Sequence, residues 1–169
     1  MIDEPRAREV AKGAFEADEV VLGGARELND GWFFPCVTKE IQHVSGVIVN
    51  KKSGRPLRVI THSPLANDLS LYDRGYQSDR YDLVVLTVEN LNETVRVLHG
   101  LHVVTLDTYY RNDRVYRVGR GLTEVEVGER LSRLPCVFSG RFDFGIEKLE
   151  QAREDGWFSF KVFEYRGKE

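Results

Sequence analysis

Two apolar segments near the start of the chain, each bordered by a glycine turn, constrain the fold more than any other feature. The first is the aromatic run Trp32–Val37, which follows Asp30-Gly31. The second is the β-branched run Val44–Asn50, which leads into Lys51–Gly54 and then into Arg55–Thr61. Apolar, β-branched and aromatic runs bounded by turn residues are typical of strands. We therefore expect an antiparallel hairpin at 44–61 beside a strand at 32–37.

The residues before these strands carry the pattern of a helix over residues 3–17. Asp3 can serve as the N-cap, and Pro5 fits the first turn. Five apolar residues fall at helical spacing on one face: Ala7, Val10, Ala11, Ala14 and Phe15. A short strand is expected at Val20-Val21-Leu22. The first 80 residues thus predict an N-terminal helix packed on a curved antiparallel sheet.

These motifs resemble the YrhB-like, immunity protein 35 family over residues 3–80. The resemblance lies in the strand Gly31-Trp32-Phe33-Phe34, in the turn Asn50-Lys51-Lys52-Ser53-Gly54, and in Tyr72 with Asp73. Such proteins neutralise a cognate bacterial toxin by tight binding. The resemblance therefore implies a non-catalytic immunity protein whose partner is a protein toxin and which needs no cofactor.

Residues 81–169 predict a second, smaller α/β module with two helices, so that the whole chain belongs to the α+β class. Leu122–Val127 carries a capping box, with Thr123 as N-cap, Glu126 as its reciprocal partner, and Leu122 and Val127 as a hydrophobic staple. The second helix is expected over Asp143–Asp155. Strands are expected at Leu83–Val88, Thr94–Leu98, Leu101–Tyr110, Val115–Val118, Cys136–Ser139 and Trp157–Tyr165.

The order helix, strand, helix, strand over residues 120–165 is similar to the C-terminal module of the bacterial ribosomal stalk protein and to a related adaptor of the N-end rule. This similarity concerns the shape of the module and its Gly121-Leu122-Thr123-Glu124 helix start. It leaves a peptide-binding adaptor open as an alternative function.

Charge and hydropathy narrow the choice of partners and location. The 169 residues carry a net charge of −3, which argues against a general nucleic-acid binder because such proteins usually have a basic excess. No apolar run approaches the roughly 20 residues of a membrane span, and the start shows no secretory signal pattern. We therefore expect a cytoplasmic protein with no membrane contact. Cys36 and Cys136 both lie in apolar runs and are expected to be buried thiols.

No residue pattern in the chain indicates catalytic or metal chemistry. His99 and His102 are three residues apart in a region expected to form strands, where that spacing points to opposite faces. The glycines lack the spacing of a nucleotide-binding loop. We expect no metal site and no catalytic residues. An uncharacterised enzyme or small-molecule binder, with a pocket between the two halves, remains an alternative.

Two segments combine arginine with tyrosine. Arg111, Arg114, Arg117 and Arg120 recur every third residue near a predicted hairpin turn, which indicates either a solvated hairpin or a contact surface for RNA or protein.

The segment from 71 to 81 is the predicted partner-binding surface, because tyrosine and arginine are frequent at interfaces. Its candidate contact residues are Tyr72, Asp73, Arg74, Tyr76, Asp79 and Tyr81. The alternative is that these tyrosine rings pack back onto the sheet.

Overall fold

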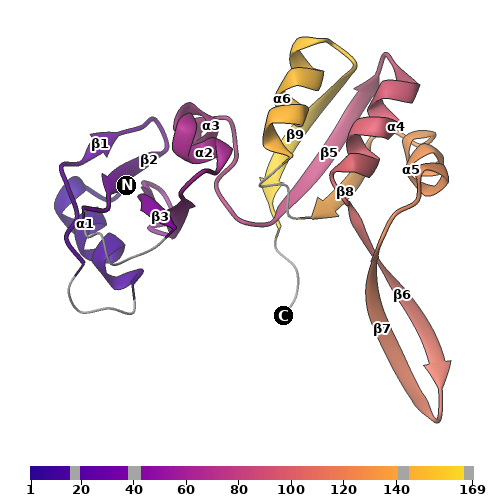
Figure 1. The fold of residues 1–169 in the computed structure, drawn as a ribbon, viewed down its shortest axis with the longest axis horizontal. Coiled ribbons are helices and arrows are strands. Elements are labelled where there is room, and N and C mark those ends of the chain that lie inside the picture. The colour runs from indigo at the N-terminus through magenta and orange to yellow at the C-terminus, as the bar shows by residue number, and fades with distance from the viewer. Residues whose placement is uncertain (16–19, 38–42, 141–144, 166–169) are drawn as a thin grey trace. The chain divides into compact units, whose positions relative to one another are not determined.

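The computed structural model describes residues 1–15, 20–37, 43–140 and 145–165 (Figure 1). The chain divides into two compact units, Met1–Ser78 and Asp79–Glu169. Both units combine helices with antiparallel sheets, which confirms the α+β class. Each unit is built from its own sheet and is described by itself below.

The first unit begins with helix α1, Glu4–Gly13. The Asp3 side chain accepts a hydrogen bond from the Arg6 amide, as expected of an N-cap, and Pro5 stands in the first turn. Ala7 and Ala11 are buried on the face that meets the sheet. The helix ends at Gly13 rather than at 17, and residues 16 and 17 lie outside the described residues.

The sheet of the first unit has the order β1-β2-β3-β4 with antiparallel pairing throughout. Its strands are β1 Arg26–Glu27, β2 Gly31–Pro35, β3 Val44–Asn50 and β4 Pro56–Ile60. The predicted hairpin is confirmed. The strand expected at Val20–Leu22 is wrong, since only Leu22 forms an isolated bridge, to Cys36. The first strand of the sheet is instead β1, whose charged residues gave no apolar pattern.

Both faces of this sheet are covered. On one face, Phe34, Val47 and Val49 pack against α1. On the other, Ile48 and Gly31 meet the ring of Tyr72, which follows the short helix α2, Pro64–Asn67, and lies within α3, Ser70–Asp73. A Cβ added at Gly31 would lie 2.9 Å from the Tyr72 ring and 2.7 Å from Ile48. The glycine therefore permits the close approach of the ring to the sheet.

The second unit contains a five-stranded sheet of order β7-β6-β8-β5-β9, with every pair antiparallel. Its elements, in chain order, are β5 Tyr81–Val88, α4 Leu91–Gly100, β6 Val104–Arg111, β7 Arg114–Gly121, α5 Glu124–Leu131, β8 Cys136–Gly140, α6 Ile146–Glu154 and β9 Phe158–Glu164. The described part of this unit thus has three helices rather than the two predicted.

The strand order shows two interlocked split βαβ units. Strands β5 and β6 flank β8 and are joined through α4, while β8 and β9 flank β5 and are joined through α6. This is the ferredoxin-like arrangement of strands and helices. Strand β7 and helix α5 form an insertion between its second and third strands.

Helix α4 replaces the strand predicted at Thr94–Leu98. The Asn90 side chain caps it by accepting from the Glu93 amide. Thr94, Val97, Leu98 and Leu101 recur at helical spacing and are buried. Burial of this apolar face outweighs the preference of β-branched residues for strands.

The remaining predictions for the second unit largely hold. The capping box at Thr123 and Glu126 is present at the start of α5. The hairpin turn lies at Asn112 and Asp113, which both have positive φ. Helix α6 starts at Ile146. The start expected at 143 lies outside the described residues.

One face of the second sheet carries the core of the unit. Leu83, Val85, Phe138 and Phe160 are buried and share one face by strand pairing. Helices α4 and α6 lie together on one side of the sheet (Figure 1). Leu98 of α4 and Leu149 of α6 are fully buried in the same core. Within the described residues, no helix has both the length and the apolar character that a membrane crossing requires.

Candidate partner-binding surface

The tyrosines of the predicted partner-binding segment are interior. Tyr72, Tyr76 and Tyr81, three of the candidate contact residues, are buried in the structure and present no exposed ring to a partner. The tyrosine rings are large and apolar apart from one hydroxyl, and their burial completes the cores of the units that contain them. For Tyr72 the alternative stated above, a ring packed back onto the sheet, describes the structure.

The charged members of that segment have different positions. The Asp73 carboxylate accepts hydrogen bonds from the Asn29 amide at 3.1 Å and from the Asp30 amide at 2.9 Å. Arg74 is exposed and its guanidinium lies 3.9 Å from Asp68. Asp79 is exposed and contributes no hydrogen bond or ion pair within the described part of the chain. Asp73 thus holds the Asn29 and Asp30 amides in place within the first unit.

The motifs behind the family resemblance meet in one hydrogen-bond network in the first unit. The Asn50 side chain donates to Gln77 Oε1 at 3.0 Å, and Gln77 Nε2 donates to Asp30 Oδ2 at 3.1 Å. Asn50 Oδ1 accepts from the Lys52 and Ser53 amides, which fixes the turn. Burial raises the pKa of Tyr72 to about 12. These residues hold two turns and a helix together.

The face of the second sheet opposite the helices has no covering element among the described residues of that unit. Two rows of residues lie across it: Val137, Val84 and Lys161 in one row, and Ser139, Asp82 and Phe163 in the other. Val104 pairs with Ser139 and extends the second row onto β6. Phe163 is 51% exposed. Ser139 donates to Asp82 at 2.5 Å within this face.

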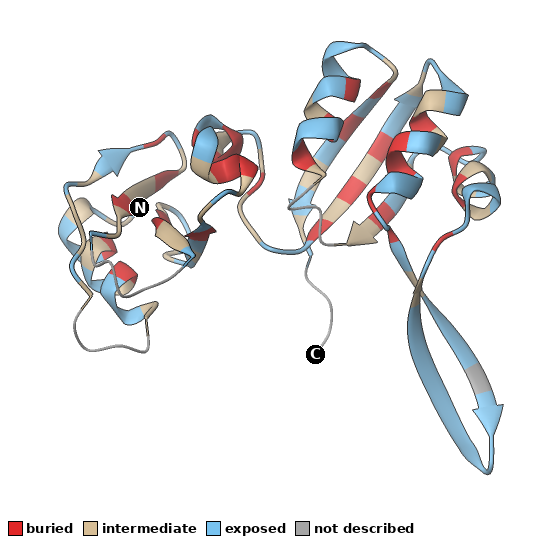
Figure 2. Cartoon of the chain, viewed as in Figure 1, coloured by how far each residue is buried: buried red, intermediate tan, exposed pale blue. Residues whose placement is uncertain are grey.

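The same face continues along the hairpin of β6 and β7, which we call the arm. Side chains alternate along a strand, so Val104, Leu106 and Tyr110 share one face, with Val115 paired to Tyr110. Leu106 is 67% exposed and Val115 is 62% exposed. Figure 2 shows the arm as largely exposed. We call this surface the open face: Asp82, Val84, Val104, Leu106, Tyr110, Val115, Val137, Ser139, Lys161 and Phe163.

The arginines of the arm differ in whether they form ion pairs. Arg120 is bound by Asp107 at 2.7 Å and by Glu126 at 2.5 Å, and these acceptors raise its pKa. Arg111, Arg114 and Arg117 are exposed, and they form no hydrogen bond or ion pair within the ranges that the structure describes. The outer half of the arm thus carries three guanidinium groups with no partner among the described side chains.

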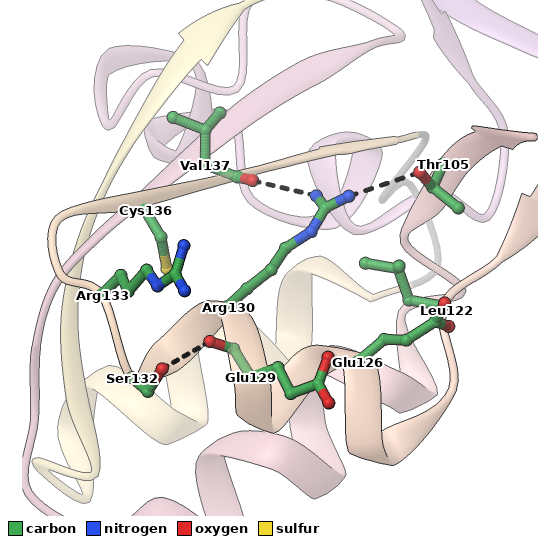
Figure 3. Close-up of a pocket in the computed structure, with 9 residues that line it drawn as sticks. All are labelled: Thr105, Leu122, Glu126, Glu129, Arg130, Ser132, Arg133, Cys136 and Val137. Carbon is green, nitrogen blue, oxygen red and sulfur yellow. Dashed lines mark hydrogen bonds between the residues drawn. The ribbon is translucent and has the colours of Figure 1, made fainter.

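A broad hollow of about 800 Å³ lies between α5 and the neighbouring strands β6 and β8 (Figure 3). Arg130 crosses it, donating to Val137 O at 3.4 Å and to Thr105 Oγ1 at 3.3 Å. The hydrogen bond from Arg120 lowers the pKa of Glu126 to about 2, and burial raises the pKa of the Cys136 thiol. The glutamate therefore stays ionised and the cysteine stays a thiol at neutral pH. Neither group suits acid, base or nucleophilic chemistry.

The histidines predicted to lie on opposite faces of strands have other positions. His99 lies in α4, and His102 follows the helix with a positive φ. His99 Nδ1 is 3.7 Å from Glu124 Oε1. Among the described residues, no group of three or more histidine, cysteine, aspartate or glutamate side chains is arranged to hold a metal ion.

No family model, curated protein or solved structure matches the chain in comparisons with known proteins.

The open face was missed at the level of sequence. The run Leu83-Val84-Val85-Leu86 is apolar on both faces, which is typical of a strand covered on both sides. Strand pairing together with the burial of Leu83 and Val85 shows which face of β5 is covered and leaves Val84 on the other face. The exposed Val104, Leu106 and Val115 were predicted as strand residues, but their alternation alone did not show which face would be uncovered.

Proposed function

We propose that the chain is a non-catalytic binding protein that neutralises a protein toxin by covering it with the open face of the second unit. The observation that carries this proposal is the number of exposed apolar side chains that the open face gathers among its polar ones: Phe163, Val137, Val104, Leu106 and Val115. Large apolar side chains exposed together on one face, with charged side chains among them, mark a candidate protein interface.

The composition of the open face supports a protein partner. Tyrosine and arginine contribute heavily to binding energy at protein interfaces, and Tyr110 and Arg117 both belong to the face that Val115 presents. A two-stranded ribbon exposed on both sides is only marginally stable in water. A partner that covers the arm would stabilise it through the same apolar side chains. The resemblance of residues 3–80 to immunity proteins supports a toxin as that partner.

A small-molecule function has less support. The hollow beside α5 has a volume within the range of ligand sites, but two of its charged side chains are already bound, Glu126 to Arg120 and Arg130 to Val137 O and Thr105 Oγ1. A ligand would have to displace these hydrogen bonds.

The proposal is tested by capture followed by reconstitution. The tagged chain is used to capture its partner from the cells of origin, and the partner is then purified and tested alone for toxicity on expression. The variant Val115→Glu places a charge in the open face, and Val125→Glu makes the same change on α5, where Val125 is 70% exposed. Because a buried unpaired charge costs several kcal/mol, we expect Val115→Glu to weaken binding roughly a hundredfold or more.

The control Val125→Glu should bind and protect cells like the parent chain. Equal binding and equal protection by Val115→Glu would show that the interface lies outside the open face. A captured protein that is harmless when expressed alone would contradict the toxin assignment.

A further inference from the structure

The outer edge of β7 offers backbone hydrogen-bonding groups. Strand β7 is the last strand of the order β7-β6-β8-β5-β9, so one of its edges is unpaired within the described part of the second unit. Arg111 pairs with Arg114 across a two-residue turn, which makes that pair hydrogen-bonded in a hairpin of this type. Alternation then directs the amides and carbonyls of Val115, Arg117 and Gly119 outward.

The charges on β7 favour one kind of neighbour. The strand holds Arg114, Arg117 and Arg120 and no acidic residue. Arg120 is neutralised by Asp107 and Glu126, whereas Arg114 and Arg117 make no hydrogen bond or ion pair inside the described ranges. A second copy of β7 pairing at this edge would bring arginine toward arginine, which is unfavourable. An acidic strand would instead place carboxylates beside both guanidinium groups.

We propose that the outer edge of β7 pairs with an extended, acidic segment of the partner protein, which adds a strand to the sheet. This inference rests on the proposed function and names the part of the partner that the arm recognises. The partner's backbone would bond to the outward amides and carbonyls, and its glutamate or aspartate side chains would meet Arg114 and Arg117. Strand addition of this kind takes affinity from main-chain hydrogen bonds and specificity from side chains.

The substitution Gly119→Pro tests the edge directly, because proline removes an outward amide and leaves every charge in place. Its matched control is Gly119→Ala, which keeps the amide and whose Cβ would meet only Leu106 Cδ2, at 4.0 Å. The probe is a synthetic peptide in which pairs of glutamates alternate with pairs of threonines, so that an extended strand carries glutamate on both of its faces. The comparison probes are the corresponding lysine–threonine peptide and a short DNA duplex. Binding is measured by fluorescence anisotropy, and amide exchange is followed by NMR.

We expect the acidic peptide to bind and to slow amide exchange at Val115, Arg117 and Gly119. Gly119→Pro should weaken this binding roughly tenfold or more, and Gly119→Ala should leave it unchanged. The double charge reversal Arg114→Glu with Arg117→Glu leaves the backbone intact and should abolish binding of the acidic peptide. The double charge reversal contains no proline. It therefore still tests the inference if the Gly119→Pro variant does not fold.

Three results would overturn the inference: equal binding of the lysine peptide, tighter binding of the DNA duplex, or unchanged peptide binding by a folded Gly119→Pro variant. The captured partner separates this inference from the proposed function. If that partner binds Gly119→Pro normally but loses affinity for Val115→Glu, the edge inference fails and the open face stands. If it binds both variants normally, the open face fails as well.

Discussion

At the residue scale, the first unit shows how a few side chains fix two turns at once. Asn50 fixes the turn after β3 through two amides and also binds Gln77, while Gln77 reaches Asp30 before β2. Asp73 binds the Asn29 and Asp30 amides from α3. No buried side-chain polar atom in the described residues is left without a hydrogen bond. A satisfied network of this kind rigidifies the structure around it.

The two aspartates of the predicted contact segment should differ in their effect on stability. Asp73→Ala leaves the Asn29 and Asp30 amides without an acceptor, so the free energy of unfolding should fall by about 1–3 kcal/mol. Asp79→Ala is the control and should change it by less than about 0.5 kcal/mol, as is usual for exposed positions. Denaturation in urea measures both. Equal effects would show that the Asp73 hydrogen bonds contribute nothing to stability.

The buried hydroxyl of Tyr72 predicts a loss of stability in alkali. Its pKa is raised from 10 to about 12 in the folded chain, because burial disfavours the phenolate. The contribution of Tyr72 is therefore fully present below pH 10 and is lost as the pH rises toward about 12. Urea denaturation over this range should show a shallower pH dependence for Tyr72→Phe than for the parent chain. The same slope in both would contradict burial of the hydroxyl.

At the element scale, helix α5 has a strongly defined start. Thr123 accepts from the Glu126 amide, and the Glu126 carboxylate accepts from the Thr123 amide at 2.9 Å and also binds Arg120 of the arm. The glutamate thus joins the helix start to the base of the hairpin. The structure of α5 is coupled to that of the arm through one side chain.

Removal of the cap should weaken α5 selectively. Thr123→Ala should lower the free energy of unfolding by about 1 kcal/mol, since one helix amide loses its acceptor. Amide exchange should quicken across residues 124–130. Ser132→Ala, near the other end of the helix, serves as a comparison because its hydroxyl donates to Glu129 O and caps no amide. Unchanged exchange at 124–130 in Thr123→Ala would rule out a stabilising cap.

How far the sequence predicted each element depended on whether its determinants are local. The capping box of α5 and the turn at Asn112-Asp113 depend on neighbouring residues and were predicted correctly. Helix α4 was missed because Thr94, Val95 and Val97 favour a strand locally, and only packing against the sheet decides otherwise. The burial of Tyr72 and Tyr76 also depends on tertiary packing. Their polar sequence neighbours gave no sign that these side chains would be buried.

At the scale of the whole molecule, each unit has its own sheet and its own buried side chains. The first core centres on Phe34, Val47 and Val49, and the second on Leu83, Phe138 and Leu149. Strand order in each sheet involves only strands of the same unit. The predicted boundary at 80 and the observed one at Ser78 both leave the two sheets intact. These are the features of domains that fold separately.

The fragment Asp79–Glu169 should therefore fold on its own. We expect a cooperative thermal transition by circular dichroism and an amide-exchange pattern for β5, α4 and β8 like that of the full chain. Because the open face lies within this fragment, it should also retain binding to the captured partner. A fragment that melts without cooperativity would show that the core of the second unit depends on residues 1–78.

The exposed arginines of the arm have a consequence for limited proteolysis. Trypsin cleaves after arginine, and the arm carries Arg111, Arg114 and Arg117 in exposed positions. A two-stranded ribbon that is exposed on both sides opens locally with ease, which gives a protease access to its backbone. Brief digestion should therefore nick the chain first at the tip of the arm, before the helices are attacked. A bound partner would shield these cleavage sites and slow the cleavage in proportion to the fraction of chain that is bound. The rate of this first cleavage would therefore measure how much of the chain is occupied by its partner.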